Sequence, residues 1–202
     1  MMELIVATRN KKKLAEIKGL LADTGMTVTS LADYKDMPKI EEDGMTFREN
    51  AIKKAATIAL YTKKLVMGED SGIEVRALHN APGVYSARYS GPQATDKKNN
   101  AKLLRALTKV PANKRQARYR CCVAIVDANG LIDVVEGSCS GTIARRPRGT
   151  NGFGYDPLFF IPRYKKTFGE LDPAIKAQIS HRARALKKFK KVIRKYCRCR
   201  RG

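Results

Sequence analysis

The sequence predicts an α/β fold in which helices pack around a mixed β-sheet. Short apolar runs end in polar turns, and stretches with apolar residues at helical spacing follow them. Of the 202 residues, 43% are hydrophobic and 30% are charged, and no segment is repeated or low in complexity. This balance is typical of a folded protein with a packed core. We therefore expect one compact unit.

In the first half of the chain, apolar strands are expected to alternate with helices. The expected elements are a strand at 4–7, a helix after residue 10 with apolar residues at 14, 17, 20 and 21, a helix at about 50–61, and a buried strand at 65–67. Thr46 and Glu49 form a capping box before the second helix. The polar segment 69–72 is expected to be a turn at the carboxyl end of the last strand, where open α/β sheets bind ligands.

The second half is expected to hold a helix, a hairpin, a glycine-rich loop and two final helices. The expected ranges are a helix at 95–107, hairpin strands at 118–127 and 131–136, and an irregular loop at 149–157. Asn129-Gly130 is a strong signal for the hairpin turn. Asp172 and Ser180 are expected to cap the last two helices. The apolar stripe of the final helix stops at Tyr196, so residues 197–202 are expected to be a frayed basic tail.

The chain is strongly basic and carries no export or membrane signal. It has 41 Lys and Arg against 19 Asp and Glu, a formal net charge of +22, which attracts polyanions. Glu3 stands where a secretory signal would carry bases, and no apolar run is long enough to cross a bilayer. Five cysteines cannot all pair, which favours a reducing, cytoplasmic location. Twelve cations follow Asp172 without an acid among them, and a solvated helix face is the plain explanation.

Two segments are suited to phosphate and metal. The first joins a strand to a helix, where free backbone N–H groups and the helix dipole favour phosphate. Its residues are Thr8, Arg9, Asn10, Lys11, Lys12 and Lys13. The glycines of a P-loop are missing, and exposed lysines at a helix start are the alternative. The acidic pairs Glu41-Glu42 and Glu69-Asp70 suit Mg²⁺, which usually takes one or two protein carboxylates, or they are ordinary surface acids.

Two later segments are suited to a nucleoside. Phe153, Gly154, Tyr155 and Asp156 place aromatic rings among glycines, as a pocket wall does where backbone approaches a planar ligand closely. His181 and Arg182 lie in the first turn of a helix, where cations oppose the dipole, so an acceptor-rich ligand would explain them. A plain loop and a surface location are the alternatives.

Taken in order, six motifs resemble the inosine/xanthosine triphosphate pyrophosphatases, which remove deaminated purine nucleotides. The motifs are Thr8-x-Asn10-x-x-Lys13-x-x-Glu16, Thr46-Phe47-x-Glu49-Asn50-Ala51-x-x-Lys54-Ala55, Glu69-Asp70-Ser71-Gly72, Pro82-Gly83-x-x-Ser86-Ala87-Arg88-Tyr89, Gly152-Phe153-Gly154-Tyr155-Asp156-Pro157 and Ser180-His181-Arg182. The similarity runs from Leu4 to about Val192. It implies one domain at 1–196 with an elongated mixed sheet and two lobes around a cleft, usually as a homodimer.

The resemblance also implies hydrolysis of ITP, dITP and XTP to monophosphate and pyrophosphate with Mg²⁺. The metal would be held by Asp70, which would also be the catalytic base, and by Glu41 or, as a near alternative, Glu42. Residues 8–13 and Ser71 would hold the phosphates, and residues 153–156 would line the nucleoside pocket. The base would be faced by Lys176, His181 and Arg182.

Three positions depart from the family's usual residues, and two other functions compete. Arg9 stands in place of glycine, Glu69 in place of aspartate and Ala183 in place of glycine. A nucleotide pyrophosphatase for modified pyrimidine or standard triphosphates would share the phosphate and metal residues. A basic nucleic-acid-binding protein would suit the charge, but no helix-turn-helix, zinc-finger or ribonucleoprotein pattern appears. We expect only weak, non-specific attraction to nucleic acid and no membrane association.

Overall fold

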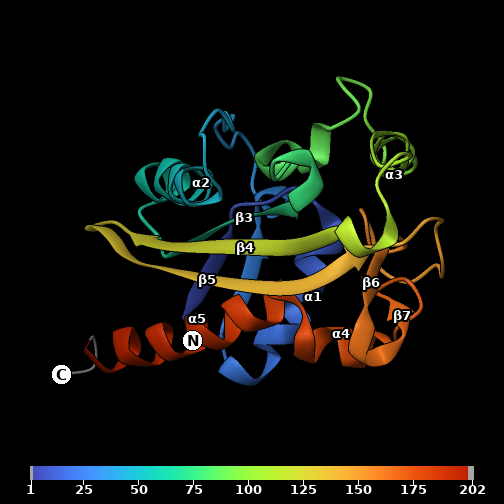
Figure 1. Cartoon of the computed structure of the whole chain (residues 1–202). Helices are drawn as coiled ribbons and strands as arrows, with labels where there is room; N and C mark the ends of the chain where they lie inside the picture. The colour runs from blue at the N-terminus through green and yellow to red at the C-terminus, as the bar shows by residue number, and fades with distance from the viewer. Residues whose placement is uncertain (1, 200–202) are drawn as a thin grey trace. The chain divides into compact units, whose positions relative to one another are not determined.

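The computed structural model describes residues 2–199 and confirms the mixed α/β class. Its strands form one sheet in the order β2-β1-β3-β4-β5-β6-β7 (Figure 1). The strands are β1 (Glu3–Val6), β2 (Thr27–Ser30), β3 (Val66–Val75), β4 (Gln116–Asp127), β5 (Gly130–Ile143), β6 (Phe159–Ile161) and β7 (Lys166–Thr167). β1 runs parallel to β2 and β3, whereas β6 is antiparallel to β5 and β7.

Five α-helices accompany these strands within the described part of the chain. They are α1 (Lys11–Leu21), α2 (Phe47–Thr62), α3 (Asp96–Ala106), α4 (Pro173–Ile179) and α5 (His181–Cys199). None of the helices between residues 2 and 199 is both long enough and apolar enough to span a membrane.

The chain divides into two compact units, each with its own apolar core. The first unit comprises residues 1–70, 121–137 and 182–202, and the second comprises 71–120 and 138–181. In the first unit, α1 and α5 pack against the strands through residues such as Ile17, Leu186 and Phe189. In the second unit, the rings of Tyr119, Phe159 and Phe168 lie 4.7 to 6.0 Å apart at the centre of the core.

Neighbouring residues of β3 face different helices within the first unit. Met67 belongs to the core formed with α1 and α5, whereas Gly68 faces α2. A Cβ atom at Gly68 would lie 2.1 Å from the carbonyl oxygen of Ala51 and 2.7 Å from the backbone nitrogen of Ala55. The missing side chain therefore allows α2 to lie directly on the strand.

The prediction of a turn at 69–72 is wrong, because β3 continues without interruption to Val75. Acids are rare in buried strands, and that scarcity favours a turn on sequence grounds alone. Here the strand pairs with β1 at Val66 and Met67 and has β4 as its other neighbour in the sheet. Glu69 and Asp70 are 3% and 5% exposed, and side chains from helices supply their charge partners.

The capping box at Thr46 is confirmed with one difference. The Thr46 hydroxyl accepts from the backbone N–H of Glu49, which fixes the start of α2 at Phe47. The Glu49 carboxylate, however, accepts from the N–H of Met45 at 2.8 Å rather than from that of Thr46.

The predicted hairpin is also confirmed, although β5 runs seven residues further than expected, to Ile143.

The expectation of a frayed tail from residue 197 onward is wrong for its described part. α5 remains helical through Cys199. Cys197 packs against the core of the first unit, where its Sγ lies 3.7 Å from the Sδ of Met2. A cysteine inside a basic segment is small and apolar enough to fill a core position. Residues 200–202 of the expected tail lie outside the described residues.

Gly68→Ala is expected to destabilise the protein by about 3 kcal/mol, because the new methyl group would meet backbone atoms of α2 that cannot rotate away. Denaturant unfolding of the purified variant measures this loss. Gly19→Ala is the matched control: Gly19 is exposed in α1 and a Cβ there would meet nothing within 4 Å. The control is expected to gain up to about 1 kcal/mol from helix propensity. Equal stabilities of the two variants would contradict the close approach of α2 to β3.

Candidate active site

The loop between β1 and α1 is held by its own polar side chains. Asn10 caps α1, since its Oδ1 accepts from the backbone nitrogens of Lys12 and Lys13 at 3.0 and 3.1 Å. The hydroxyl of Thr8 accepts from the N–H of Asn10 at 3.2 Å. Two of the backbone donors that we expected to be free are thus occupied by Asn10. Among the described residues, the exposed side chains of Arg9, Lys11 and Lys12 have no ion-pair partner, so they remain available to an anion.

Glu69 lies at the centre of a buried charge network on the α1 and α5 side of β3. Its Oε1 accepts from Arg182 at 3.0 Å, and its Oε2 lies 3.3 Å from the Lys13 ammonium. Arg182, in the first turn of α5, also donates to Glu16 of α1. The thiol of Cys121 on β4 donates to Glu69 at 3.4 Å. This arrangement ties the loop lysine to β3, and it raises the pKa of Arg182 because two carboxylates together outweigh its burial.

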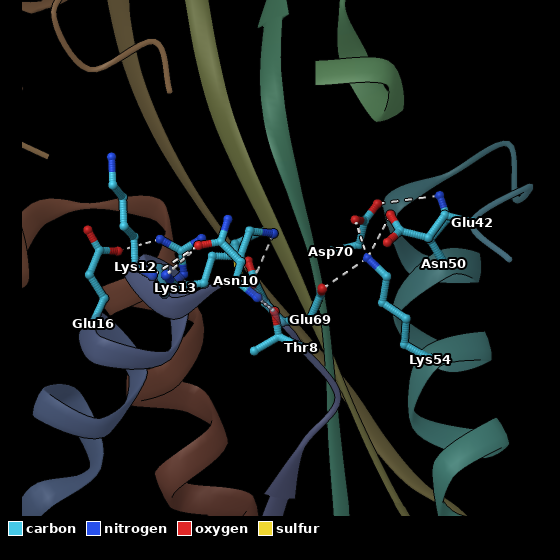
Figure 2. A network of polar contacts seen from close by, with 12 residues as sticks. Thr8, Asn10, Lys12, Lys13, Glu16, Glu42, Asn50, Lys54, Glu69 and Asp70 are labelled. Atoms are coloured by element: carbon cyan, nitrogen blue, oxygen red, sulfur yellow. Dashed lines mark hydrogen bonds and ion pairs between the residues drawn. The ribbon is translucent and has the colours of Figure 1, made fainter. Parts of the chain in front are cut away.

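Asp70 points the other way, toward α2 (Figure 2). Its Oδ1 accepts from the Lys54 ammonium at 2.8 Å, and its Oδ2 accepts from the Asn50 amide at 3.4 Å. The same ammonium lies 2.9 Å from Glu42 and 3.3 Å from the carbonyl oxygen of Glu69. Lys54 is therefore shared between two carboxylates, only one of which is buried.

This sharing explains the pKa directions of the pair. Burial opposes the charge of Lys54, but Asp70 and Glu42 together outweigh it and raise the pKa of the lysine. Burial also raises the pKa of Asp70, and Lys54 only partly offsets that effect while Glu42 adds to it. One cation is divided between two acids, so the buried carboxylate is left short of compensating charge.

The acidic loop at 41–45 is attached to α2 by successive contacts. The loop and helix partners are Glu42 with Lys54 at 2.9 Å, Asp43 with Lys53 at 2.6 Å, Gly44 with Asn50 at 2.8 Å and Met45 with Glu49 at 2.8 Å. These contacts bring Glu42 to the Asp70 centre. Glu41 precedes them, is exposed, and forms no hydrogen bond or ion pair with a described residue. Its carboxylate is consequently available to an added cation.

In the second unit, the predicted nucleoside residues Phe153, Asp156 and Lys176 lie together. Asp156, 2% exposed, accepts from the backbone N–H of Phe153 at 2.8 Å and from the Lys176 ammonium at 2.6 Å. That ammonium lies 5.1 Å from the centre of the Phe153 ring. Gly152 has φ +76°, and a Cβ there would lie 2.0 Å from Asp156 Oδ2, so only glycine permits this loop closure.

The first turns of α3 fix the next residue of the loop. The Gly154 N–H donates to Asp96 at 2.8 Å, and its carbonyl oxygen accepts from Asn100 at 2.9 Å. Gly154 has φ +62°, which the two contacts hold in place. The Asn100 side chain is 8% exposed, and its Oδ1 makes no hydrogen bond in the described structure. The glycine-rich loop is thus positioned by a helix to which sequence reasoning assigned no role.

Three other predicted site residues lie in the core or within a strand. Tyr155 is buried in the core of the second unit, and its hydroxyl donates to the carbonyl oxygen of Ser86 at 2.8 Å. His181 stacks on Tyr119 with ring centroids 4.5 Å apart and planes 6° apart. Ser71 follows Asp70 within β3. The Tyr155 side chain therefore anchors the loop in the core of the second unit.

Sequence reasoning missed Lys54, Asn50, Asp96 and Asn100. A signal was present for the first two, because Asn50 and Lys54 are spaced by four residues and share one face of α2. Polar residues on the face of a helix that carries buried alanines must find partners inside the fold. In α3, Asn99 and Asn100 are similarly buried.

The arrangement in the first unit has the components of a phosphoryl-transfer site. Exposed cations lie at the amino end of α1, and carboxylates lie on β3. Cations of this kind bind and orient a polyphosphate. Carboxylates orient water or hold a divalent metal. Among the described residues, no cluster of three or more His, Cys, Asp or Glu side chains suits a metal. A metal here would therefore rely on few protein ligands, as Mg²⁺ does beside phosphates.

Comparison with known proteins identifies a family and several similar chains. Residues 4–192 match the model of the Ham1 family. The chain is 50% identical over 192 residues to a dITP/XTP pyrophosphatase of Desulforamulus reducens, covering 95% of this chain and 96% of that one. It superposes on a HAM1 protein from Coxiella burnetii with a TM-score of 0.88 and 41% identity, over 96% of this chain and 100% of that chain. A nucleoside-triphosphatase / dITP/XTP pyrophosphatase from Mycobacterium abscessus gives a TM-score of 0.76 and 41% identity, over 93% and 97%.

Arg182→Met is expected to lower the free energy of unfolding by about 3–5 kcal/mol, because it leaves the buried Glu69 without its main partner. Denaturant titration at neutral pH measures the loss. The double variant Glu69→Gln/Arg182→Met is expected to recover a large part of it, since the unpaired charge is then gone. A double variant no more stable than Arg182→Met alone would show that Glu69 is not the source of the loss.

Proposed function

The chain belongs to the Ham1 family, and we propose that it hydrolyses the deaminated purine nucleoside triphosphates ITP, dITP and XTP at a centre built on Asp70. The products are the nucleoside monophosphate and pyrophosphate. The observation that carries the proposal is the buried Asp70 carboxylate, whose lysine partner it shares with Glu42. A buried acid with incomplete charge compensation lowers the stability of the fold. Its presence therefore favours a functional role.

The allocation of residues follows the contacts within each unit. Residues 8–13 bind the polyphosphate: Arg9, Lys11 and Lys12 face solvent, while Lys13 is oriented by Glu69. Ser71, adjacent to Asp70 on β3, adds a hydroxyl for a phosphate oxygen. In the second unit, residues 153–156, Lys176 and His181 bind the nucleoside. Arg182 donates to Glu16 and Glu69 of the protein itself, so its role is to position Glu69 rather than to contact the base.

Asp70 is the group that orients and deprotonates the attacking water. Hydrolysis that releases pyrophosphate requires attack on the α-phosphorus, with the remaining phosphates clamped and their charge offset. The cations of the β1–α1 loop supply the clamp. Lys54 holds Asp70 in place at 2.8 Å and Asn50 holds its second oxygen, so the carboxylate meets its substrate in a fixed orientation.

The donor set fits a divalent cation, for which we propose Mg²⁺. Asp70 and the acidic loop supply carboxylate oxygens, and the loop is fixed to α2 by four contacts. We assign Glu41 as the second metal ligand, because Glu42 is already engaged with Lys54 while Glu41 has no partner among the described residues. When bound, the metal would offset phosphate charge and lower the pKa of water.

Selection of the base depends on the 6-oxo edge. Hypoxanthine and xanthine present O6 as an acceptor, where adenine presents an N6 donor. The Lys176 ammonium donates to Asp156, and a further N–H of it would pair with O6 but lose that pairing beside adenine, at a cost of roughly 1–3 kcal/mol. The cation also lies beside the Phe153 ring, on which a base can stack. We further infer a cytoplasmic homodimer from the family resemblance, and sedimentation of the purified chain tests the dimer.

ITP, dITP and XTP are expected to be cleaved about 5 to 150 times faster than ATP, the range that one lost donor pairing of roughly 1–3 kcal/mol predicts. The test is pyrophosphate release from a panel of nucleoside triphosphates, with products identified by chromatography. GTP and modified pyrimidine triphosphates belong in the panel, since they share phosphates but differ at the base. Equal kcat/KM for ATP and ITP would contradict the assignment, and a pyrimidine preference would favour the closest rival function.

Asp70→Asn is expected to abolish turnover while the protein stays folded. The amide keeps the volume and can still accept from Lys54, but it cannot take a proton from water or neutralise a cation. Steady-state ITP hydrolysis in excess magnesium measures the turnover, and thermal unfolding shows whether the variant is folded. Near-normal activity of a folded variant would remove Asp70 from its assigned role.

Glu41→Gln, compared with Glu42→Gln, distinguishes the two candidate metal ligands. Glu41→Gln is expected to raise the magnesium concentration needed for half-maximal activity, with little change in stability, because Glu41 has no partner between residues 2 and 199. Glu42→Gln removes the charge from the Lys54 contact and is expected to lower stability with a smaller change in magnesium dependence. The opposite pattern would assign the metal to Glu42.

A further inference from the structure

α5 presents a cationic surface that the proposed function leaves unexplained. We define the α5 basic face as the exposed side chains Lys187, Lys188, Lys191, Arg194, Lys195 and Arg198. The opposite side of the helix is apolar and buried in the core of the first unit, through Leu186, Phe189 and Ile193. The buried stripe fixes the rotation of α5, so all six cations point to solvent together. Along the helix they span about 16 Å at 1.5 Å per residue.

Few acids offset this face. α5 carries no Asp or Glu between residues 181 and 199. Asp23, which follows α1, accepts from Lys190 and lies in the field of Arg194. Within residues 2–199, no acid forms an ion pair with Lys187, Lys188, Lys191, Lys195 or Arg198. The charges of the α5 basic face are therefore directed outward.

Helix stability does not account for the face. Cations in the last turn interact well with the helix dipole, which explains Arg198 and its neighbours but not Lys187, Lys188 or Lys191. Residues three or four apart are neighbours on a helix, and like charges at that spacing repel. Lys191 alone has four such neighbours within the face, at positions 187, 188, 194 and 195. A bound polyanion would relieve this repulsion.

We propose that the α5 basic face binds the phosphate backbone of double-stranded nucleic acid. A nucleoside triphosphate is too short to engage cations spread over this length, whereas a duplex carries one charge per roughly 1.7 Å of axis. The face offers no aromatic ring for stacking, which single-stranded nucleic acid would use. It also exposes no apolar side chain that could enter a lipid surface. The contacts are therefore with phosphates, and recognition is independent of base sequence.

The number of cations sets the expected salt dependence. About five phosphate contacts give a slope near −4.5 in a plot of log affinity against log salt concentration, or a loss of about 500-fold between 50 and 200 mM. Removing four of the cations is expected to reduce the slope to about −1. This change in slope reports phosphate contacts directly and is independent of nucleotide hydrolysis.

The test uses the full chain and the variant Lys187→Gln/Lys188→Gln/Lys191→Gln/Lys195→Gln. Binding to a short labelled duplex of arbitrary sequence is followed by fluorescence anisotropy over a range of salt concentrations. The matched control removes four exposed cations elsewhere, as Lys35→Gln/Arg105→Gln/Lys109→Gln/Lys114→Gln, so both variants have the same net charge. Thermal unfolding and ITP turnover of both variants show that the fold and the separate enzymatic centre are intact.

The expected result is loss of duplex binding and of salt slope in the α5 variant, with the control close to the parent chain. Three results would overturn the proposal: no measurable duplex binding by the parent at low salt, equal losses in both variants, or stronger binding to single strands of matched length. Acidic phospholipid vesicles are tested at equal phosphate concentration. Preferential binding to them would assign the face to a membrane surface instead. Failure of ITP hydrolysis in the parent chain would bear on the proposed function alone.

Discussion

The pleat of β3 is the constraint on which the polar structure of the first unit depends. Neighbouring side chains in a strand point to opposite faces, so Glu69 and Asp70 leave the sheet in opposite directions. Both are buried, and each needs a cation from the helices that it faces: Lys13 and Arg182 for the first, Lys54 for the second. The helices thus provide the apolar cover of the sheet and also the charges that permit acids inside it.

Elements governed by local interactions were predictable from the sequence. The Thr46 cap and the apolar spacing of α1 and α5 act over a few residues, and the structure confirms these helices. The polar part of β3 was not predictable in this way, because its strand form depends on partners that are distant in the chain. Lys54 is 16 residues from Asp70, and Arg182 is 113 residues from Glu69. Such pairings become visible only when the tertiary structure is known.

The residues of the candidate site also fall into two groups, those that motifs indicate and those that only the tertiary structure reveals. Motif order led us to propose Asp70, the acidic pairs and the glycine-rich loop as site residues, since those residue types indicate their chemistry directly. The groups that hold them in position, such as Asn50 and Asp96, are ordinary polar residues of helices and carry no comparable signal. Backbone donors at the start of α1 were expected to be free for phosphate, yet Asn10 occupies two of them. Residue type indicated the chemistry, while geometry determined which donors remain available.

The first unit is assembled from both ends of the chain, and this has a consequence for folding during synthesis. Its core combines strands from the first seventy residues with Leu186, Phe189 and Ile193 of α5, which is synthesised more than a hundred residues later. The second unit, by contrast, lies entirely within residues 71–181. It can therefore form first, whereas the earliest strand lacks the part of its cover that α5 supplies until that helix has been synthesised. Glu69 must likewise remain hydrated until Arg182 emerges, so burial of the acid is a late event of biosynthesis.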